Sequence, residues 1–437
     1  MPNPIPIAST APAPVARSRR ARSGRAAVTD RRLLDAAMAL VAEQGWDAAS
    51  VLAVARRAGM TSRAVNDRFD TRSDLAIGVW HDGPAGALGD ALTSLTDAML
   101  PAAGAEQGGL VAGSRPAGSN GEAHGLPELL RMARPSEQLV VAAELLCAGV
   151  FDPALREVIS ADLRERLGTR CFPGQGTSDS QAAQAAYLVA TGLGLLLAYR
   201  RPLAAELDIS PLATALVAAL ADPAQPQSLP GVDAGQMRLD PVGPVHDDHD
   251  ALLEGTILEV AESGYAAATL ARIVARVGVT QGLVYSRYRN KIELFMGAVR
   301  WRTEYALRTN LDWFAQLTSE FGAGIAEAVS WREFMRPEHA LGRALALEQV
   351  RVGWREPEFR AEHDAAELAF TEHVLAINPQ ASHDALLAQV HWDLAMGYGA
   401  ELLPSFMPHA WSLPFDVVTV PLFGTRDQPG LIAPLVS

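Results

Sequence analysis

Apolar residues recur at spacings of three and four along most of the chain, with polar residues between them. This period is that of an amphipathic α-helix, which turns one face to a core and the other to water. An alternating pattern typical of a β-strand is found only near the end, from Phe415 to Leu422. The pattern predicts an all-α protein with at most one strand in its last residues.

The longest apolar run extends from Ala185 to Tyr199 and contains two glycines. It is shorter than the ~18–20 residues of a membrane span, so we interpret it as a buried helix. Residues 1–28 lack the apolar core of a signal peptide. We therefore expect a cytoplasmic protein without membrane association.

One block of the chain occurs twice, 219 residues apart and without a gap. Shorter matches follow at offsets of 204 and 205, and a Gly/Ala/Ser-rich stretch in the first half, Ala102 to Gly125, accounts for the difference. A helical protein of about 200 residues has therefore been duplicated end to end. The paired positions are Gly45 and Gly264, Gly59 and Gly278, Phe69 and Tyr288, Leu75 and Leu294, Gly149 and Gly353, and Gln184 and Gln389.

Each copy of the block predicts three short helices that lead into a fourth. The first helix ends at Gly45 or Gly264, which suit a left-handed cap, and the second begins after the N-capping hydroxyls of Ser50 or Thr269. The predicted core positions are Leu34, Ala37, Met38 and Val41 with Leu253, Thr256, Ile257 and Val260 in the first helix, and Val51, Val54, Ala55 and Ala58 with Leu270, Ile273, Val274 and Val277 in the second.

A very short turn separates the second and third helices. Gly59-Met60-Thr61 and Gly278-Val279-Thr280 each combine a C-capping glycine, an apolar residue and an N-capping hydroxyl. Helices joined in this way cross steeply, which is the helix-turn-helix arrangement. The third helix has few apolar residues, so its outer face is free to enter a DNA major groove. Its apolar positions are Val65 and Phe69 in one copy and Val284 and Tyr288 in the other.

The fourth helix opens with a capping residue and a cation, Thr71-Arg72 or Asn290-Lys291. A helix N-terminus beside a cation suits a DNA phosphate. Residues 32–76 and 251–295 resemble the N-terminal DNA-binding domain of the TetR family of transcriptional regulators. The resemblance implies double-stranded DNA as a partner, a small-molecule effector, and a helical C-terminal domain in each half that binds the effector and supplies dimer contacts.

The second copy matches the family pattern more closely than the first. The resemblance implies phosphate contacts from Thr269, Tyr285 and Lys291 and base contacts from Gln281, Gly282, Leu283 and Ser286, with Thr280 and Arg287 on the same surface. The first copy has Asn66 in place of the tyrosine, Arg63 in place of a glycine, Arg72 in place of the lysine, and the acid Asp67 on the exposed face. Its corresponding DNA-binding set is Ser50, Thr61, Ser62, Arg63, Ala64, Asn66, Asp67, Arg68 and Arg72.

Charge is unevenly distributed along the 437 residues, whose net charge is −13. Residues 1–80 hold twelve arginines against seven acids, and five of those arginines lie in the Pro/Ala/Ser-rich first 28 residues. We interpret these 28 residues as a disordered basic arm. Between Leu270 and Lys291 there are basic residues and no acid, which favours a phosphate surface. The only two cysteines, Cys147 and Cys171, favour a reduced compartment over a disulfide scaffold.

These features predict six segments. They are a basic arm at 1–28, helix-turn-helix domains at 29–80 and 249–295, helical effector and dimerisation-like domains at 81–221 and 296–437, and a linker at 222–248. The Pro-rich stretch from Asp222 to Asp250 is interpreted as flexible, long enough for the two halves to pair with each other. A homodimer of whole chains is the competing arrangement.

The second helical domain is much richer in aromatic residues than the first. Large rings fill cores but also line ligand pockets. The segments Ala183–Tyr199 and Ala388–Leu403 resemble the family's dimer helices, with Gly192, Gly194, Gly397 and Gly399 allowing close approach. The candidate effector-binding residues are Trp301, Tyr305, Trp331, Trp354, Trp392 and Tyr398.

No other constellation indicates chemistry. His246, His249 and the neighbouring aspartates have metal-binding side chains but lie in the Pro-rich stretch without helical spacing, so we expect no metal there. No phosphate loop or nucleophile motif is present, so we expect neither an enzyme nor a cofactor. The sequence predicts a sequence-specific DNA-binding regulator, with a ligand-responsive repressor as the favoured form. The alternative is a helical ligand-binding or scaffold protein that has lost DNA binding in one or both units.

Overall fold

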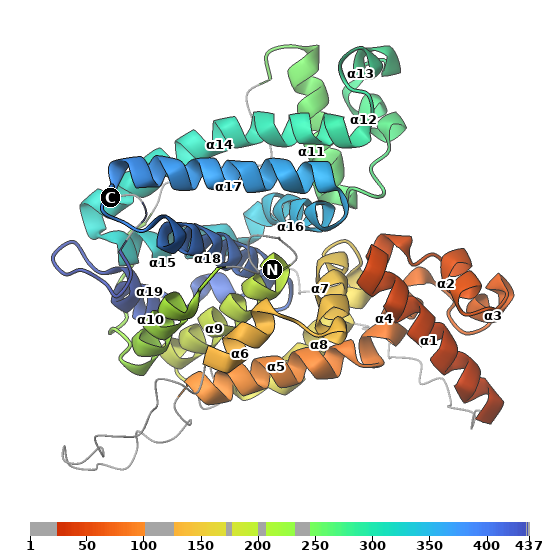
Figure 1. Cartoon of the computed structure of the whole chain (residues 1–437), viewed down its shortest axis with the longest axis horizontal. Helices are drawn as coiled ribbons and strands as arrows, with labels where there is room; N and C mark the ends of the chain where they lie inside the picture. The colour runs from red at the N-terminus through yellow and green to blue at the C-terminus, as the bar shows by residue number, and fades with distance from the viewer. Residues whose placement is uncertain are drawn as a thin grey trace, which may run out of the picture.

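A computed structural model describes residues 24–100, 126–171, 177–199, 207–231, 245–433 and 435. These residues form nineteen α-helices and, within the described ranges, no strand (Figure 1). The all-α prediction is confirmed. Most of the predicted basic arm and the predicted loop from Ala102 to Gly125 lie outside the described residues, but α1 begins at Gly24, so the last five residues assigned to the arm are helical.

The predicted alternating stretch near the C-terminus is wrong, because residues Asp416–Phe423 form the helix α19. Val417 and Val418 are buried together with Leu422, one turn further on. This spacing of four places the apolar side chains on one helical face, and the apparent alternation depended on Thr419, which is also buried. Tertiary packing has overridden the β-propensity of the valines.

The first half contains ten helices. Its helix-turn-helix unit comprises the first three, and α4 and α5 are separated by Gly83, which has a φ of 149°, followed by Pro84. The helices are α1 (Gly24–Gln44), α2 (Val51–Arg57), α3 (Ser62–Asn66), α4 (Arg72–His81), α5 (Pro84–Met99), α6 (Leu126–Ala133), α7 (Glu137–Gly149), α8 (Pro153–Cys171), α9 (Asp179–Ala198) and α10 (Ser210–Ala221), with the 3-10 turn η1 (Trp46–Ala48) after α1.

The second half repeats this order with one difference. The helix that follows its helix-turn-helix unit, α14, is continuous over 31 residues where the first half has a break. The helices are α11 (Asp248–Ser263), α12 (Leu270–Val277), α13 (Gln281–Arg287), α14 (Lys291–Phe321), α15 (Ala323–Met335), α16 (Ala340–Arg355), α17 (Pro357–Ile377), α18 (His383–Leu402) and α19 (Asp416–Phe423), with the 3-10 turns η4 (Pro337–His339), η5 (Leu403–Ser405) and η6 (Ala410–Ser412).

The two halves pack against each other chiefly through α9 and α18. Two glycines permit this approach: a Cβ on Gly194 would collide with the carbonyl oxygen of Ala395, and a Cβ on Gly399 with that of Ala190. The other two predicted glycines do not serve the contact. A Cβ on Gly192 would face side chains of its own half, and one on Gly397 would meet open space.

The helix α9 is buried, as its composition predicted. Among the described residues it is the one helix long and apolar enough to cross a membrane, but 94% of its most apolar stretch is buried inside the protein. The nearest elements account for this burial, because α5, α6 and α8 of its own half and α18 of the other half surround it. The apolar run therefore builds the centre of the fold.

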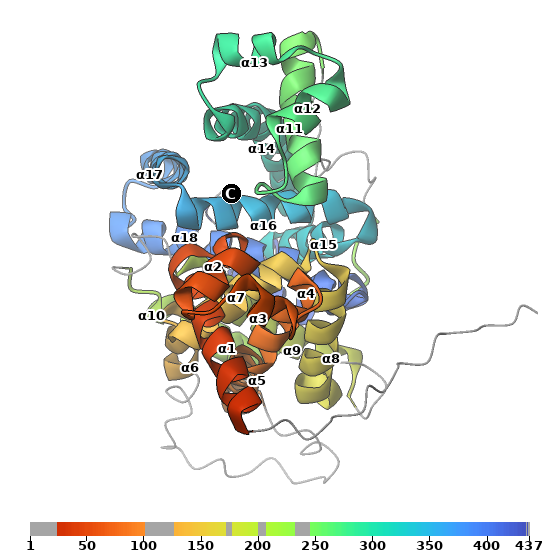
Figure 2. The same cartoon turned by 90° about the vertical axis from the view of Figure 1, so that its right-hand side faces the viewer.

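The two helix-turn-helix units differ in how they join this centre (Figure 2). The buried residues of α1 to α4 belong to the same apolar cluster as the helices around α9 and α18. The second unit has a separate cluster, to which α16 and α17 contribute Leu345, Val352 and Phe359. The first unit is thus continuous with the main core, whereas the second is built on a core of its own.

The predicted core of the first helix is accurate in the second unit and displaced in the first. In α11 all four predicted positions are buried. In α1 the buried face is centred on Leu33, Ala37 and Leu40, and the predicted Leu34 and Met38 are only partly buried. The sequence Leu33-Leu34 is compatible with either of two buried faces of α1, and packing against α7 determines which face is buried.

The start of the predicted flexible linker is held against the second half. The backbone N–H of Ala224 donates to the carbonyl of Val417 at 2.9 Å, and that of Gln227 donates to the carboxylate of Asp416. Arg332 donates to the carbonyl of Pro230 at 2.8 Å. The prediction of a fully flexible segment is therefore wrong for the described residues 222–231.

Candidate nucleic-acid interface

Four hydroxyl residues begin the second and third helices of both units. Ser50 and Thr269 accept from the backbone N–H groups of Ala53 and Arg272, and Thr61 and Thr280 accept from those of Ala64 and Leu283. In each case the side-chain oxygen satisfies an N–H that the helix leaves unpaired. All four residues are exposed, so each hydroxyl is accessible to a phosphate oxygen that could accept its hydrogen.

The third helix of the second unit, α13, turns a polar and aromatic face outward. Val284 is buried beneath it, while Tyr285 is 61% exposed. Gln281, Gly282, Ser286 and Arg287 are also exposed and Leu283 is half-buried. The predicted base-facing residues Gln281, Gly282 and Ser286 and the predicted phosphate-facing Tyr285 are therefore all accessible on α13.

The corresponding helix of the first unit, α3, is shorter and carries opposed charges. Val65 is buried below it, Arg63, Asn66 and Asp67 are exposed, and Ser62 and Ala64 are half-buried. Arg63 and Asp67 lie 3.9 Å apart, one turn from each other. The carboxylate offsets part of the arginine's attraction for phosphate.

Arg68 and Arg287 occupy the same position in the two copies but point differently. Arg68 donates to the carboxylate of Asp30 at 2.5 Å and to the carbonyl of Ala64 at 3.0 Å, so the structure turns it inward. At the position of Asp30 the second unit has His249, whose ring bonds instead to the hydroxyl of Tyr288 at 2.8 Å. This exchange leaves Arg287 exposed.

The cation that opens the fourth helix makes the same contact in both units. Arg72 donates to the carbonyl of Trp46 at 2.6 Å, and Lys291 donates to the carbonyl of Tyr265 at 2.7 Å. Each cation also lies over the ring of that residue, at 4.8 Å and 4.0 Å from its centre. These contacts join the fourth helix to the turn after the first, and they hold the cation at the edge of the proposed DNA surface.

Burial lowers the pKa of the Lys291 ammonium, and the nearby carboxylates of Glu348 and Asp47 oppose that shift. Burial likewise lowers the pKa of the Arg72 guanidinium. A partly desolvated cation interacts more strongly with an incoming anion, because less solvent screens the interaction.

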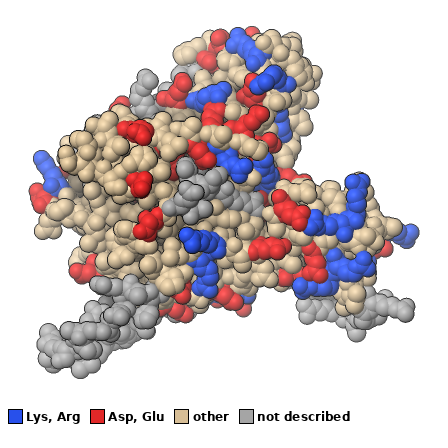
Figure 3. All heavy atoms as spheres, in the orientation of Figure 1, with Lys and Arg blue, Asp and Glu red and all other residues tan. Residues whose placement is uncertain are grey.

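The expectation of an unopposed positive face on the second unit is wrong. Arg272 and Arg276 form ion pairs with Glu259 of α11, and Arg276 also pairs with Glu262. Arg289 pairs with Glu293 at 3.2 Å. The sequence between Leu270 and Lys291 contains no acid, but the neighbouring helices supply them. Figure 3 shows Lys and Arg side chains over both units, with Asp and Glu side chains among them.

The family model of bacterial regulatory proteins of the tetR family matches the chain twice, at residues 33–79 and 252–297. Both matches fall on the helix-turn-helix units described above. The chain carries two TetR-type DNA-binding domains in tandem. The matches overlap the two stretches whose sequence resembles this family, 32–76 and 251–295, and do not extend over the helical bundles. No curated protein matches the chain significantly.

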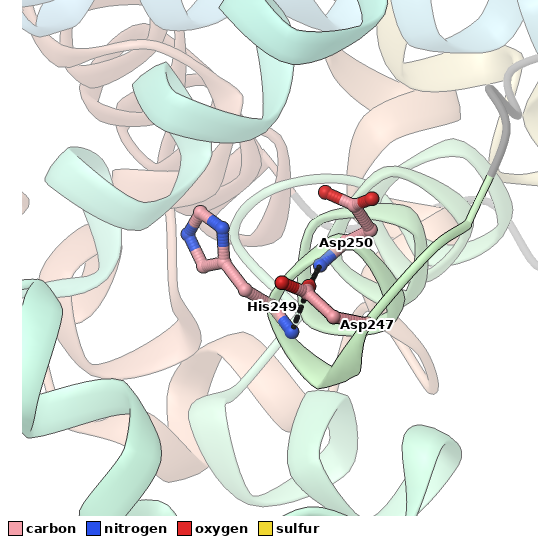
Figure 4. A group of neighbouring side chains, drawn as sticks. All are labelled: Asp247, His249 and Asp250. Carbon is pink, nitrogen blue, oxygen red and sulfur yellow. Dashed lines mark hydrogen bonds between the residues drawn. The ribbon is translucent and has the colours of Figure 1, made fainter.

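The histidine and aspartates before the second TetR-type unit have structural partners (Figure 4). The Asp247 carboxylate caps α11 by accepting from the backbone N–H groups of His249 and Asp250, at 2.8 Å each. These backbone hydrogen bonds hold the pKa of Asp247 below its usual value. His249 is engaged with Tyr288, and His246 is exposed.

The structure does not bring the predicted effector-binding residues together. Trp331 and Trp392 are buried in the main core, where Trp331 stacks on Tyr187 of the first half at 4.3 Å. Trp301 packs against the separate core of the second TetR-type unit, and the side chain of Tyr305 lies outside the described residues. Trp354 and Tyr398 line one small hollow of about 20 Å³.

A buried ionic cluster between the halves was not predicted. The carboxylate of Glu144 on α7 accepts from the backbone N–H of Trp46, at 3.3 Å, and pairs with Arg355 of α16. Arg355 and Arg351 both bond to Asp47, at 2.6 and 3.0 Å. Burial alone would raise the pKa of Asp47, but the two guanidinium groups outweigh it and hold the pKa below its usual value.

One contact of this cluster, the glutamate that accepts from the backbone after the first helix, recurs in the second half of the chain. Glu348, 204 residues after Glu144, accepts from the backbone N–H of Tyr265 at 2.7 Å. The sequence offered one signal for this contact, because a glutamate recurs at the repeat offset of 204 residues. The arginines that complete the first cluster come from the second half, and no local pattern indicates such a contact.

Proposed function

We propose that the protein is a sequence-specific DNA-binding transcription repressor that responds to a small ligand. The observation that carries this proposal is the pair of exposed recognition helices, α3 and α13, presented by TetR-type units within one packed body. DNA would be bound by phosphate contacts around each helix N-terminus and by base contacts from the outer helical face.

The second unit supplies most of the DNA affinity in this proposal. It combines exposed Tyr285 and Arg287 with the positioned Lys291, and its recognition helix carries no acid. In the first unit Arg68 is bonded to Asp30, and Arg63 has Asp67 beside it. The first unit would therefore help to fix the position of the protein along the DNA and would add weaker contacts.

The two units of a single chain act as an intramolecular pseudo-dimer in this proposal. The α9–α18 packing supports it, because these helices correspond to the two dimer helices of ordinary family members, and they already pair within the chain. Since α3 and α13 differ in sequence, the operator would be asymmetric, with half-sites about one helical turn apart. A homodimer of whole chains on a longer palindrome is the competing arrangement.

A salt titration of DNA binding tests the function. Sites selected from random duplexes should bind the full chain with an affinity that falls steeply as salt rises, because phosphate contacts release counterions. Replacing Gln281 and Ser286 by Ala should reduce the preference for the selected site over random DNA. Binding without sequence preference, or no binding at low salt, would favour a ligand-binding or scaffold protein instead.

A further inference from the structure

The two junctions between TetR-type units and helical bundles have the same backbone arrangement but different chemistry. At the first junction Gly45 lies against Arg355, whose guanidinium joins the ionic cluster with Asp47 and Glu144. At the second junction the equivalent glycine, Gly264, lies against the carboxylate of Glu348 and the ring of Phe151. Phe151 is 204 residues before Arg355, so an apolar ring stands where the other junction has a cation.

Two further members of the cluster are also replaced at the second junction, whereas Glu144 is matched there by Glu348. Cys147 stands at the position of Arg351, and Ala266 at that of Asp47. Burial raises the pKa of the Cys147 thiol, so this residue is neutral and contributes no ion pair. The first unit is therefore locked to the opposite half by charge, whereas among the described residues no ion pair across the halves holds the second unit at its junction.

A pocket of about 460 Å³ lies at this second junction. It is bounded by the end of α11, the first turns of α16, the turn between α7 and α8, and the end of α18. Its volume is in the range of pockets that enclose small ligands. Because α11 is the first helix of the second TetR-type unit, anything bound there contacts that unit and both bundles.

The side chains around the pocket favour an anion with an apolar part. Arg156 and Arg343 line it together with Phe151, while Glu262 is already paired with Arg276. Oε2 of Glu401 is buried without a hydrogen-bond partner among the described residues. Burial raises the pKa of Glu401 to about 8, although Arg302 and Arg343 oppose the shift. At neutral pH this group is a neutral donor, which leaves the pocket with an excess of positive charge.

We propose that this pocket binds a small amphipathic carboxylate, whose anionic group pairs with Arg343 and accepts a hydrogen bond from Glu401 while its apolar part lies on Phe151. The ligand acts as the effector by setting the angle of the second TetR-type unit, a role that rests on the proposed function. The separate core of that unit allows the movement, and the locked first unit provides the fixed reference.

Binding of benzoate and octanoate to the full chain, measured calorimetrically without DNA, tests the site. Both should bind, and benzylamine and benzyl alcohol should not. Ala340 is exposed at the rim of the pocket, so the large ring of Ala340→Trp should block the pocket and abolish carboxylate binding. The control variant Ala366→Trp, at an exposed position of α17 outside the pocket, should leave carboxylate binding unchanged. Carboxylate binding that survives Ala340→Trp, or no carboxylate binding at all, would overturn the proposal.

The Glu401→Gln variant distinguishes an anionic ligand from a cationic one. A glutamine still donates a hydrogen bond, so carboxylate binding should be retained within about threefold. Preference for benzylamine, lost in Glu401→Gln, would assign a cation site and refute the proposal. Arg343 also donates to the carbonyls of Phe334 and Arg336, whereas Arg156 donates to one carbonyl, that of Val150. Arg156→Gln therefore disturbs fewer hydrogen bonds and should weaken carboxylate binding.

The effector role has a separate readout. Saturating benzoate should change the affinity of the full chain for its selected DNA site at least fivefold, and Ala340→Trp should remove the change. Calorimetric binding without any effect on DNA affinity would refute the effector role and leave the pocket as a ligand site. A chain that binds no DNA would instead contradict the proposed function, while the calorimetric result still decides the pocket.

Discussion

At the residue scale, the side chains proposed to touch DNA divide into those that the protein leaves free and those that it uses internally. Tyr285 is exposed on one face of its helix, whereas Lys291 is bonded to the carbonyl of Tyr265. Removing Tyr285 should therefore alter DNA binding alone, whereas removing Lys291 should also loosen the turn after α11.

We expect Tyr285→Ala to weaken DNA binding about tenfold with no change in melting temperature, because one hydrogen bond to a charged phosphate is worth ~1.5 kcal/mol. Lys291→Ala should weaken binding at least as much and also lower the melting temperature. Asn66→Ala and Arg72→Ala should have smaller effects on affinity in a titration at fixed salt. Equal or larger losses from the first-unit variants would contradict the proposed division of labour.

The raised pKa of Glu401 predicts how stability depends on pH. Between its ordinary value of 4.5 and its folded value of about 8, the unfolded chain has released a proton that the folded chain retains. Stability from this group is therefore complete below pH 4.5 and declines as the pH rises towards 8. Glu401→Gln should match the parent near pH 4.5 and melt ~2–4 °C higher at pH 8. A gain of equal size at both pH values would show that Glu401 is not the titrating group.

At the scale of elements, the contact between α9 and α18 offers a matched pair of glycines. Gly399→Ala places a Cβ against the carbonyl of Ala190 and should destabilise the chain by about 2 kcal/mol. Gly397→Ala, two residues before Gly399 on another face of the helix with open space around its Cβ, should be neutral or stabilising by up to ~1 kcal/mol because alanine favours the helix. Equal effects of the two variants on the unfolding midpoint would show that the helices do not approach closely.

The ionic cluster between the halves should behave as a coupled unit. Arg355→Ala removes one guanidinium partner from each of Glu144 and Asp47, which keep their contacts with Arg351. The loss should cost about 2–3 kcal/mol, because both carboxylates are partly or fully buried. The double variant with Asp47→Ala should cost less than the sum of the single variants by about 1 kcal/mol. Strict additivity in urea unfolding would contradict the coupling.

The sequence predicted some features of these elements and missed others. Each capping hydroxyl and each turn glycine could be located, because capping depends on neighbouring residues. The partners of Arg68, Arg276 and Arg355 could not, because each partner lies on another helix and two sequences with the same local pattern can pair differently. For the same reason the predicted aromatic residues did not define a pocket, whereas the junction of four distant segments did.

At the scale of the whole molecule, the duplication places two unlike TetR-type units on one body. One is held by ion pairs across the halves and shares the main core, and the other has its own core. An ordinary dimer of identical chains cannot distinguish its two units in this way. We therefore propose that the fused chain reads two different half-sites and responds to a ligand through one unit only.

The mass of the protein on its selected DNA site tests this account most directly. Light scattering or native mass spectrometry of the full chain with a short duplex should give one chain of 46.5 kDa per site, on a sequence whose two halves differ. Two chains on a palindromic site would contradict the intramolecular pseudo-dimer.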